Sequence, residues 1–358
     1  QQRFGHKTNP GRVPERGLPT SQITFANLLK AAGYTTGLVG KWHLGMTPEL
    51  HPQSRGFDEF FGFLSGAHSY LDATADARNL IYRGRKPVDE KQYLTDAFTR
   101  EAVSFIERRR KQPFFLYLAY NAVHRPMQAT EKYLARFASI TDQTRRTYAA
   151  MLSAMDNGIG AVLRKLNETG LEKDTLVFFF SDNGGPAANG SNNNPLRGRK
   201  GSMFEGGIRV PFLVKWPRRI PAGTVYRPPV IRLDVLPTAV AAARAKLPKD
   251  RPLDGVNLLP HLTEKNPKSP HSVLFWRVRA NRAVRKENWK LIRSGTRPAQ
   301  LFDLSKDIGE TTDLAPKKPE TVRQLSQALA RWEAKMVSPL WSPRRQPRTR
   351  KRATRAKP

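Results

Sequence analysis

The sequence predicts an α/β protein whose mostly parallel sheet is covered by helices on both faces, followed by a small antiparallel-sheet and helix subdomain. Short unbroken apolar runs alternate with amphipathic helical patterns as far as Leu247, which is typical of parallel strands buried on both sides. Beyond that point the strands become short and alternating. The chain has 358 residues, of which 39% are hydrophobic, so it can bury a sizeable core.

The helices and strands of the first part follow one another in order. A helix is predicted over residues 25–32, where apolar residues recur every three or four positions, and Gly33 is placed to end it. Further helices are predicted over residues 98–106 and 148–166. The apolar runs that predict buried strands are GLVG (37–40), FFLYLAY (114–120), TLVFFF (175–180) and PFLVK (211–215).

The composition changes after Leu247. Residues 248–270 are rich in Pro, Asn and Lys and are predicted to connect two parts of the chain, whereas residues 272–292 and 301–302 carry short strand patterns. A terminal helix is predicted over residues 319–336. We therefore expect a first domain over 1–247, a C-terminal subdomain over 248–336 and a basic disordered tail over 337–358.

The net charge of +32 makes the chain strongly basic. The segment 343–358 holds eight of the positive charges and no acidic residue, and it could attract an anionic polymer in a salt-dependent way or could simply be solvated. We expect no specific nucleic-acid partner and no membrane partner, since no apolar run approaches the ~20 residues that span a bilayer. The absence of cysteine excludes disulfides and a cysteine nucleophile within this chain.

Polar side chains follow three of the predicted strands directly. Lys41 and His43 come after the first, His124 after the second, and Asp182 and Asn183 after the third. Because ligands bind at the carboxyl ends of parallel strands, we expect these groups to meet at one edge of the sheet. Each of them alone also fits an ordinary role, such as a solvated lysine, a hydrogen-bonded histidine or an Asp-Asn-Gly turn. Carboxylate and amide oxygens favour Ca²⁺ or Mg²⁺ over softer metals.

A glycine-rich basic stretch, LRGRKGSMFEGGIRVP (196–211), follows the third of these strands. Its glycines would let the backbone approach a ligand closely, and Lys200 could reach an oxyanion as a point charge. Taken together, these groups suit an anionic substrate held near a hard cation.

Several of these motifs resemble one known family. GKWHLG (40–45), HPQSRGFDEFFGF (51–63), SDNGG (181–185) and LRGRKGSMFEGGIRVPFLVKWP (196–217) resemble the formylglycine-dependent, or type I, sulfatases of the arylsulfatase kind. WRVRANRAVRKENWKLI (276–292) and LFDLSKDIGETTDLA (301–315) resemble the C-terminal subdomain of that family. The resemblance implies an alkaline-phosphatase-like α/β/α sandwich, bound Ca²⁺ and hydrolysis of the sulfate ester of a small molecule or carbohydrate.

The resemblance also implies roles for particular residues. Asp182 and Asn183 would be metal ligands, and Lys41 and Lys200 would bind the sulfate and the nucleophile's oxygen. Cations in these positions would stabilise the sulfuryl oxygens.

The two histidines would manage protons. His43 would contact the hydrated formylglycine and help the aldehyde to re-form, and His124 would lie near the leaving-group oxygen, whose protonation helps departure.

The chain departs from the family pattern in its nucleophile. The Cys/Ser-x-Pro-x-Arg motif that gives formylglycine is missing, and so are the acidic metal ligands expected on the family's first strand. We therefore expect an N-terminally truncated sulfatase that, in this form, binds Ca²⁺ weakly and turns over no substrate. Loss of the first strand would also leave an unpaired sheet edge. The family is usually exported, which predicts a periplasmic or extracellular location.

Two other interpretations remain open. The chain could be a non-catalytic basic protein that binds an anionic polymer, or a phosphoesterase on the related fold, because sulfate and phosphate esters are alike in geometry. The sequence predicts no oligomeric state.

Overall fold

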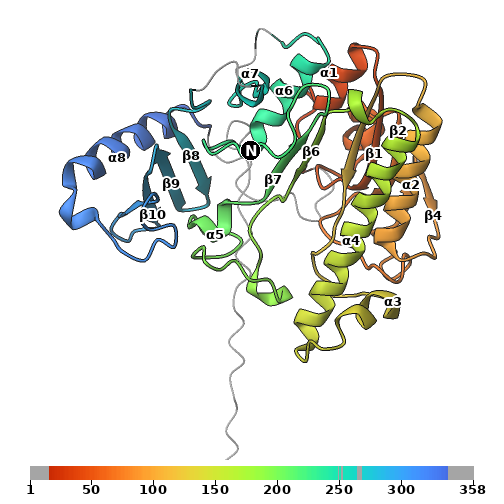
Figure 1. Ribbon diagram of the computed structural model, residues 1–358, viewed down its shortest axis with the longest axis horizontal. Helices are drawn as coiled ribbons and strands as arrows, with labels where there is room; N and C mark the ends of the chain where they lie inside the picture. The colour runs from red at the N-terminus through yellow and green to blue at the C-terminus, as the bar shows by residue number, and fades with distance from the viewer. Residues whose placement is uncertain (1–15, 249, 251–252, 264–267, 338–358) are drawn as a thin grey trace, which may run out of the picture.

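The structure is a computed structural model that describes residues 16–248, 250, 253–263 and 268–337. Figure 1 shows a larger α/β part, which holds the N-terminal half of the chain, and a smaller part made of a sheet and one long helix. The tail predicted over 337–358 lies, apart from Val337, outside the described residues.

The main sheet has five strands in the order β4-β3-β2-β1-β5. The central strand β1 runs parallel to both β2 and β5, while β3 and β4 form an antiparallel edge beyond β2. The strands span Thr35–Lys41 (β1), Glu59–Phe63 (β2), Ile81–Arg83 (β3), Lys86–Val88 (β4) and Phe114–Ala119 (β5). The fold is therefore the predicted α/β class with a parallel core.

The central strands β1 and β2 are buried on both faces of the sheet. Leu38 pairs in register with Phe60 and packs on one face, where α1 (Phe25–Ala31) covers the sheet. Val39 pairs with Phe61 and packs on the opposite face, beneath α2 (Leu94–Arg109) and α4 (Gln143–Glu168). Because successive strand residues point to opposite faces, a strand covered on both sides needs an unbroken apolar run. This arrangement explains the GLVG pattern and confirms the layered architecture.

The predicted helices form where the apolar periodicity indicates. Thr24 caps α1 through reciprocal bonds with Asn27, and Gly33 follows the helix with a φ of +87°. Asp142 caps α4 by accepting a hydrogen bond of 2.6 Å from the Arg145 backbone N–H. The shorter helices are α3 (Glu131–Leu134), α5 (Glu205–Ile208), α6 (Val235–Ala242) and α7 (Leu259–Leu262). None of the helices that the structure describes combines the length and the apolar character needed to cross a bilayer.

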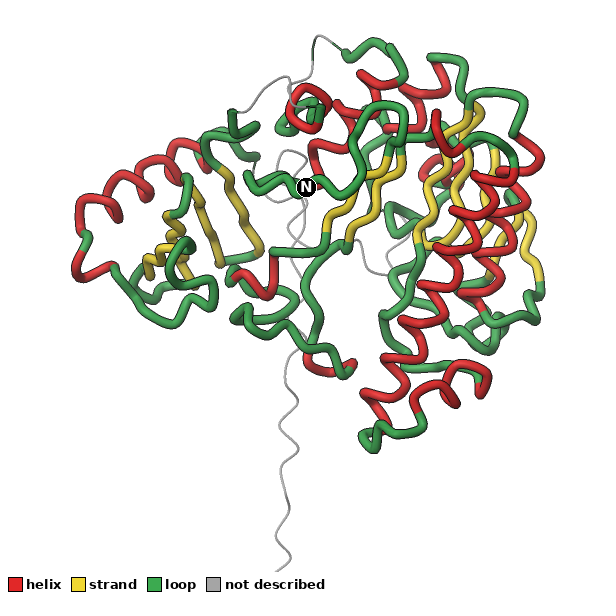
Figure 2. Tube along the Cα trace, viewed as in Figure 1, coloured by secondary structure: helices red, strands yellow, loops and turns green. Residues whose placement is uncertain are grey.

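The third and fourth predicted strands do not extend the main sheet. β6 (Val177–Phe180) and β7 (Phe212–Lys215) pair only with each other, antiparallel, in a two-stranded ribbon. In Figure 2 this ribbon stands between the main sheet and the C-terminal sheet. Within the described residues β5 is bonded only to β1, and Tyr117 on β5 is 45% exposed. An apolar run predicts a strand but does not tell which strand will lie at an edge.

The C-terminal part is an antiparallel sheet in the order β11-β10-β9-β8, covered by α8 (Pro319–Glu333). Its strands are Leu274–Val278 (β8), Asn281–Lys286 (β9), Trp289–Ser294 (β10) and Gln300–Asp303 (β11). Val284, Leu291 and Leu301 face Leu325 and Leu329 of α8, so the sheet buries one face under the helix. The predicted antiparallel sheet with its terminal helix is confirmed, while the exact domain boundaries stay a prediction.

Candidate active site

The end of β1 positions Lys41 and His43. Gly40 has a φ of +117°, and a Cβ there would lie 2.1 Å from the carbonyl oxygen of Ala119 on β5, so only glycine permits this close approach. Trp42 is buried and donates from Nε1 to the carbonyl oxygen of Leu50 at 2.9 Å. This anchored indole fixes the backbone between Lys41 and His43.

His43 adopts an uncommon backbone conformation. Its φ is +56°, in the left-handed region that residues other than glycine rarely occupy. Its N–H donates to the carbonyl oxygen of Leu64 at 3.0 Å, and Gly66 lies so close that a Cβ there would be 2.7 Å from the imidazole Cε1. The segment that follows β2 therefore binds the backbone of His43 through Leu64 and lies against its ring at Gly66.

The segment after β5 carries His124. The buried Tyr70 hydroxyl donates to the carbonyl oxygens of Asn121 and His124, at 2.7 and 2.9 Å, and so fixes the path of this loop. The Nδ1 atom of His124 lies 2.8 Å from the carbonyl oxygen of Arg125. A carbonyl can only accept, so in the neutral ring Nδ1 carries the proton and Nε2 is the basic nitrogen.

The turn after β6 carries Asp182 and Asn183. Ser181 Oγ donates to the Asn183 carbonyl oxygen at 3.0 Å, and Arg232 Nη1 donates to the Asp182 carbonyl oxygen at 3.1 Å. Lys200 joins this turn through its backbone N–H, which donates to the carbonyl oxygen of Gly185 at 3.3 Å. The turn and the glycine-rich loop therefore meet, although fourteen residues lie between Gly185 and Lys200 in the chain.

The charges of the predicted residues act on one another. Burial lowers the pKa of Lys41; Asp182 opposes this shift and Lys200 adds to it. Burial, together with the charges of Lys41, His124 and Lys200, lowers the pKa of His43 to about 4. The structure therefore places five predicted side chains close enough to interact electrostatically: Lys41, His43, His124, Asp182 and Lys200.

His124 belongs to the same field. Burial is the main cause that lowers its pKa; the hydrogen bond to Arg125 opposes the shift, Lys41 and Lys200 add to it, and Asp182 opposes it. Two ammonium groups beside two neutral imidazoles form a site that favours an anion, because a bound anion would relieve the mutual repulsion. Asn183 follows Asp182 in the turn after β6, and its side-chain amide donates to the Gly184 carbonyl oxygen at 3.1 Å.

The metal site is incomplete within the described part of the chain. No group of three or more His, Asp or Glu side chains there could hold a metal ion. Asp182 and Asn183 offer oxygen donors of the kind that Ca²⁺ prefers, but together they fill at most about half of its 6–8 positions. These residues offer the right type of ligand atom for Ca²⁺ but too few of them. We therefore assign no chemical step to a metal.

Three residues that support the site are not evident from the sequence. Tyr70 holds the His124 loop, and Arg232, in the 3₁₀ helix Arg232–Asp234, holds the Asp182 turn. Asn193 binds Gly185 through both its carbonyl oxygen and its amide nitrogen, at 3.0 and 2.9 Å. Tyr70 and Arg232 act on backbone atoms 54 and 50 residues away, and Asn193 acts on a backbone eight residues away, and no sequence pattern encodes such contacts.

The sequence matches known sulfatase families along most of its length. The Sulfatase family profile matches residues 1–245, and the profile "N-sulphoglucosamine sulphohydrolase, C-terminal" matches residues 199–335. N-acetylgalactosamine-6-sulfatase of Mus musculus is 37% identical over 262 residues, which are 68% of this chain and 49% of that protein. Arylsulfatase J of Mus musculus is 30% identical over 94% of this chain and 66% of its own length. The chain thus spans about half the length of the first of these relatives.

Solved structures with a similar fold were also found. The crystal structure of Ps i-CgsB in complex with k-i-k-neocarrahexaose has a TM-score of 0.90 and 36% identity, and the match covers 95% of this chain and 80% of that one. A phosphonate monoester hydrolase from Silicibacter pomeroyi has a TM-score of 0.68 at 18% identity, which indicates a shared fold.

Proposed function

The chain belongs to the sulfatase family, and from that premise we propose that the site at the ends of β1, β5 and β6 binds the sulfate group of a sulfate ester and supports its hydrolysis. The observation that carries this proposal is the position of Lys41, His43 and His124 at the ends of two adjacent parallel strands, within the field of Lys200. Burial is the main cause that lowers the pKa of all three groups, and the charge of Lys200 adds to each shift. Such a positive electrostatic field around half-buried side chains is expected at an anion-binding site. It is not expected for lysines that are simply solvated at the surface.

We assign the roles by chemistry. Lys41 and Lys200 would neutralise the sulfuryl oxygens, and the basic Nε2 of His124, once protonated, would donate a proton to the oxygen of the departing alcohol. Water supplies the remaining atoms, so that the ester yields an alcohol and inorganic sulfate. His43 would exchange protons with the nucleophile of the reaction.

Two groups implied by the family lie outside what this sequence supplies. A formylglycine would provide the nucleophile, yet the chain has no cysteine and no serine in the corresponding motif. Asp182 and Asn183 would contribute part of a calcium site. We therefore expect a polypeptide of this sequence alone to bind sulfate without releasing it from an ester.

We propose a sulfated carbohydrate as the substrate, acted on outside the cytoplasm. The relatives named above include an N-acetylgalactosamine-6-sulfatase and a structure that holds a neocarrahexaose. The net charge of +32 would draw a polyanionic chain toward the protein by long-range attraction. The same charge also suits a protein that performs no chemistry and holds anionic polymers on a diffuse basic surface.

Lys41→Met is expected to weaken the binding of inorganic sulfate about tenfold, because it removes one charge-assisted contact. Isothermal titration calorimetry of the 358-residue chain with sodium sulfate, at constant ionic strength, measures this change. Lys111→Met is the matched control, since Lys111 is exposed just before β5, at the opposite end of that strand. Equal loss in both variants would indicate a diffuse basic surface and would contradict the proposed site.

Sulfate binding is also expected to strengthen by about threefold or more as the pH falls from 7 to 5. In the free protein His43 is neutral over this range because its pKa is about 4. A bound dianion favours the imidazolium and raises that pKa, so binding takes up a proton and gains from acidification. Titration at several pH values measures the slope, and His43→Gln should reduce it. Affinity that falls or stays constant on acidification would exclude this role for His43.

A further inference from the structure

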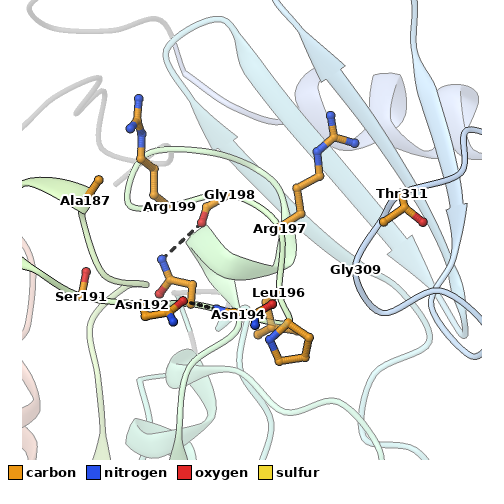
Figure 3. A pocket seen from close by; sticks show the side chains of 12 residues that line it. Ala187, Ser191, Asn192, Asn194, Leu196, Arg197, Gly198, Arg199, Gly309 and Thr311 are labelled. Atoms are coloured by element: carbon orange, nitrogen blue, oxygen red, sulfur yellow. Dashed lines mark hydrogen bonds between the residues drawn. The ribbon is translucent and has the colours of Figure 1, made fainter.

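A cavity of about 710 Å³ lies beside the glycine-rich loop, outside the group of six residues discussed above. One side is formed by the segment from Ser191 to Arg199, and the other by Gly309 and Thr311 of the C-terminal part. Figure 3 shows the cavity with these two segments facing each other. Its size falls within the range of pockets that bind small molecules, about 300–1,000 Å³.

The cavity is joined rigidly to the proposed active site. Asn193 bonds both backbone polar groups of Gly185, in the turn that carries Asp182, and its amide also donates to the Gly198 carbonyl oxygen at 3.2 Å. Lys200 follows the cavity-lining Arg199 directly and binds the same Gly185. The cavity and the proposed active site therefore share one hydrogen-bonded loop.

The charge of the cavity is entirely positive. Arg197 and Arg199 line it, and none of its described lining residues is acidic. Arg197 is fixed, because Nη1 donates to the Glu310 carbonyl oxygen at 2.7 Å and the guanidinium lies 4.1 Å from the centre of the Phe204 ring. Arg199 is exposed and has no ion-pair partner within the described ranges. Two guanidinium groups without a carboxylate favour an anionic ligand.

The remaining lining suits a sugar. The Asn194 side chain makes no hydrogen bond in the part of the chain that the structure describes, and Asn192 uses only its carbonyl oxygen, which accepts from the Asn194 backbone N–H at 2.9 Å. These amides can both donate to and accept from hydroxyl groups. Leu196 adds an apolar surface on which the carbon face of a sugar ring can pack.

We propose that this cavity is a second subsite, which binds a further sulfated sugar unit of the same oligosaccharide whose ester group occupies the Lys41–Lys200 site. This inference rests on the proposed function and extends it to the substrate class: an oligosaccharide that carries sulfate on more than one unit. Arg199 would contact the second sulfate, while Asn192 and Asn194 would contact the hydroxyl groups. A monosaccharide sulfate would fill only the first site.

The test compares three ligands on the full chain by calorimetry: a κ-carrageenan hexasaccharide, its chemically desulfated counterpart and inorganic sulfate. The sulfated hexasaccharide should bind more tightly than the other two. Arg199→Gln should weaken hexasaccharide binding about tenfold and leave the binding of inorganic sulfate unchanged. Asn194→Ala should weaken it less, because it removes contacts without charge.

Arg164→Gln is the matched control. Arg164 is exposed on α4, about 28 Å along the helix from Arg145, the residue that donates to the Gly190 carbonyl oxygen beside the cavity. The subsite is disproved if Arg199→Gln binds the hexasaccharide as the unchanged chain does, or if the desulfated ligand binds equally well. Parallel loss of inorganic sulfate binding would place Arg199 in the first site instead. Failure of sulfate itself to bind, or to respond to Lys41→Met, would refute the proposed function separately.

Discussion

Lys290→Met is expected to lower the free energy of unfolding by about 3–5 kcal/mol, since it breaks a buried ion cluster, leaves Glu310 without a cationic partner and leaves Glu205 only its 3.8 Å contact with Arg209. Lys290 on β10 is fully buried, and its Nζ lies 2.7 Å from Glu205 Oε1 and 2.8 Å from Glu310 Oε1. Glu310 also accepts from the Glu205 backbone N–H at 2.6 Å. Urea unfolding followed by tryptophan fluorescence measures the change.

The cluster joins the C-terminal sheet to the loop that carries Lys200. Glu205 begins α5 at the end of that loop, so the loss of Lys290 should also loosen Lys200 and weaken sulfate binding. Lys286→Met, at the exposed end of β9, is the matched control and should change the stability by less than about 0.5 kcal/mol. Equal stability of the two variants would show that the cluster contributes nothing beyond its apolar surroundings.

The loss of unfolding free energy in Lys290→Met should depend on pH. Burial already raises the pKa of Glu310, and the charge of Lys290 opposes that shift. Without Lys290 the pKa rises further, so Glu310 binds a proton in the folded variant at a pH where the unfolded chain does not. Stability lost at pH 8 should therefore be partly regained near pH 5. A deficit independent of pH would mean that packing and not charge accounts for the effect.

Asp234→Ala is expected to lower the free energy of unfolding by about 3–4 kcal/mol, because several buried donors lose their acceptor. The carboxylate is fully buried and accepts from the backbone N–H groups of Ile231 and Val256 at 2.8 and 2.9 Å. Each of its oxygens also lies 2.9 Å from Nε2 of His271. This one side chain ties the start of α6 to the chain just before β8, and thermal or urea unfolding measures its contribution.

Two further variants sharpen that measurement. Asp234→Asn keeps one oxygen acceptor and should recover part of the loss. Asp156→Ala, on the exposed face of α4, removes a carboxylate without buried partners and should have little effect. If Asp234→Ala were no more destabilising than Asp156→Ala, the buried hydrogen bonds would contribute no net stability.

Local sequence was sufficient for the longer helices and for β1 and β5 of the main sheet, whereas β2, β3 and β4 and the short helices were not predicted. The helix over Phe98, Phe105 and Ile106 forms as its periodicity predicts, with these side chains buried, and the unbroken run at Leu38 and Val39 lies between two covered faces. The periodicity was less informative about exposure at single positions. Leu152 follows the helical pattern of α4 and is nevertheless 41% exposed, because the pattern does not show how wide the covering layer is.

Some residues of the candidate site could be predicted from the sequence, and others could not. The rule that ligands bind beyond the carboxyl ends of strands predicted Lys41, His43 and His124 as site residues from their positions in the sequence, and this assignment stays a prediction. The contacts of Tyr70 and Arg232 with backbone carbonyls 54 and 50 residues away could not be predicted, since such pairings depend on how the loops pack.

The spacing of apolar residues along the chain was enough to predict the longer helices, the strands β1 and β5 and the charged groups that follow them, but not β2, β3 and β4. Only the tertiary structure decided that β6 and β7 form a separate ribbon, and that Lys290 is enclosed between Glu205 and Glu310. It alone also formed the arginine-lined cavity beside Lys200. Each of these features joins segments far apart in sequence, and the free energy of such contacts depends on burial and geometry that no local pattern carries.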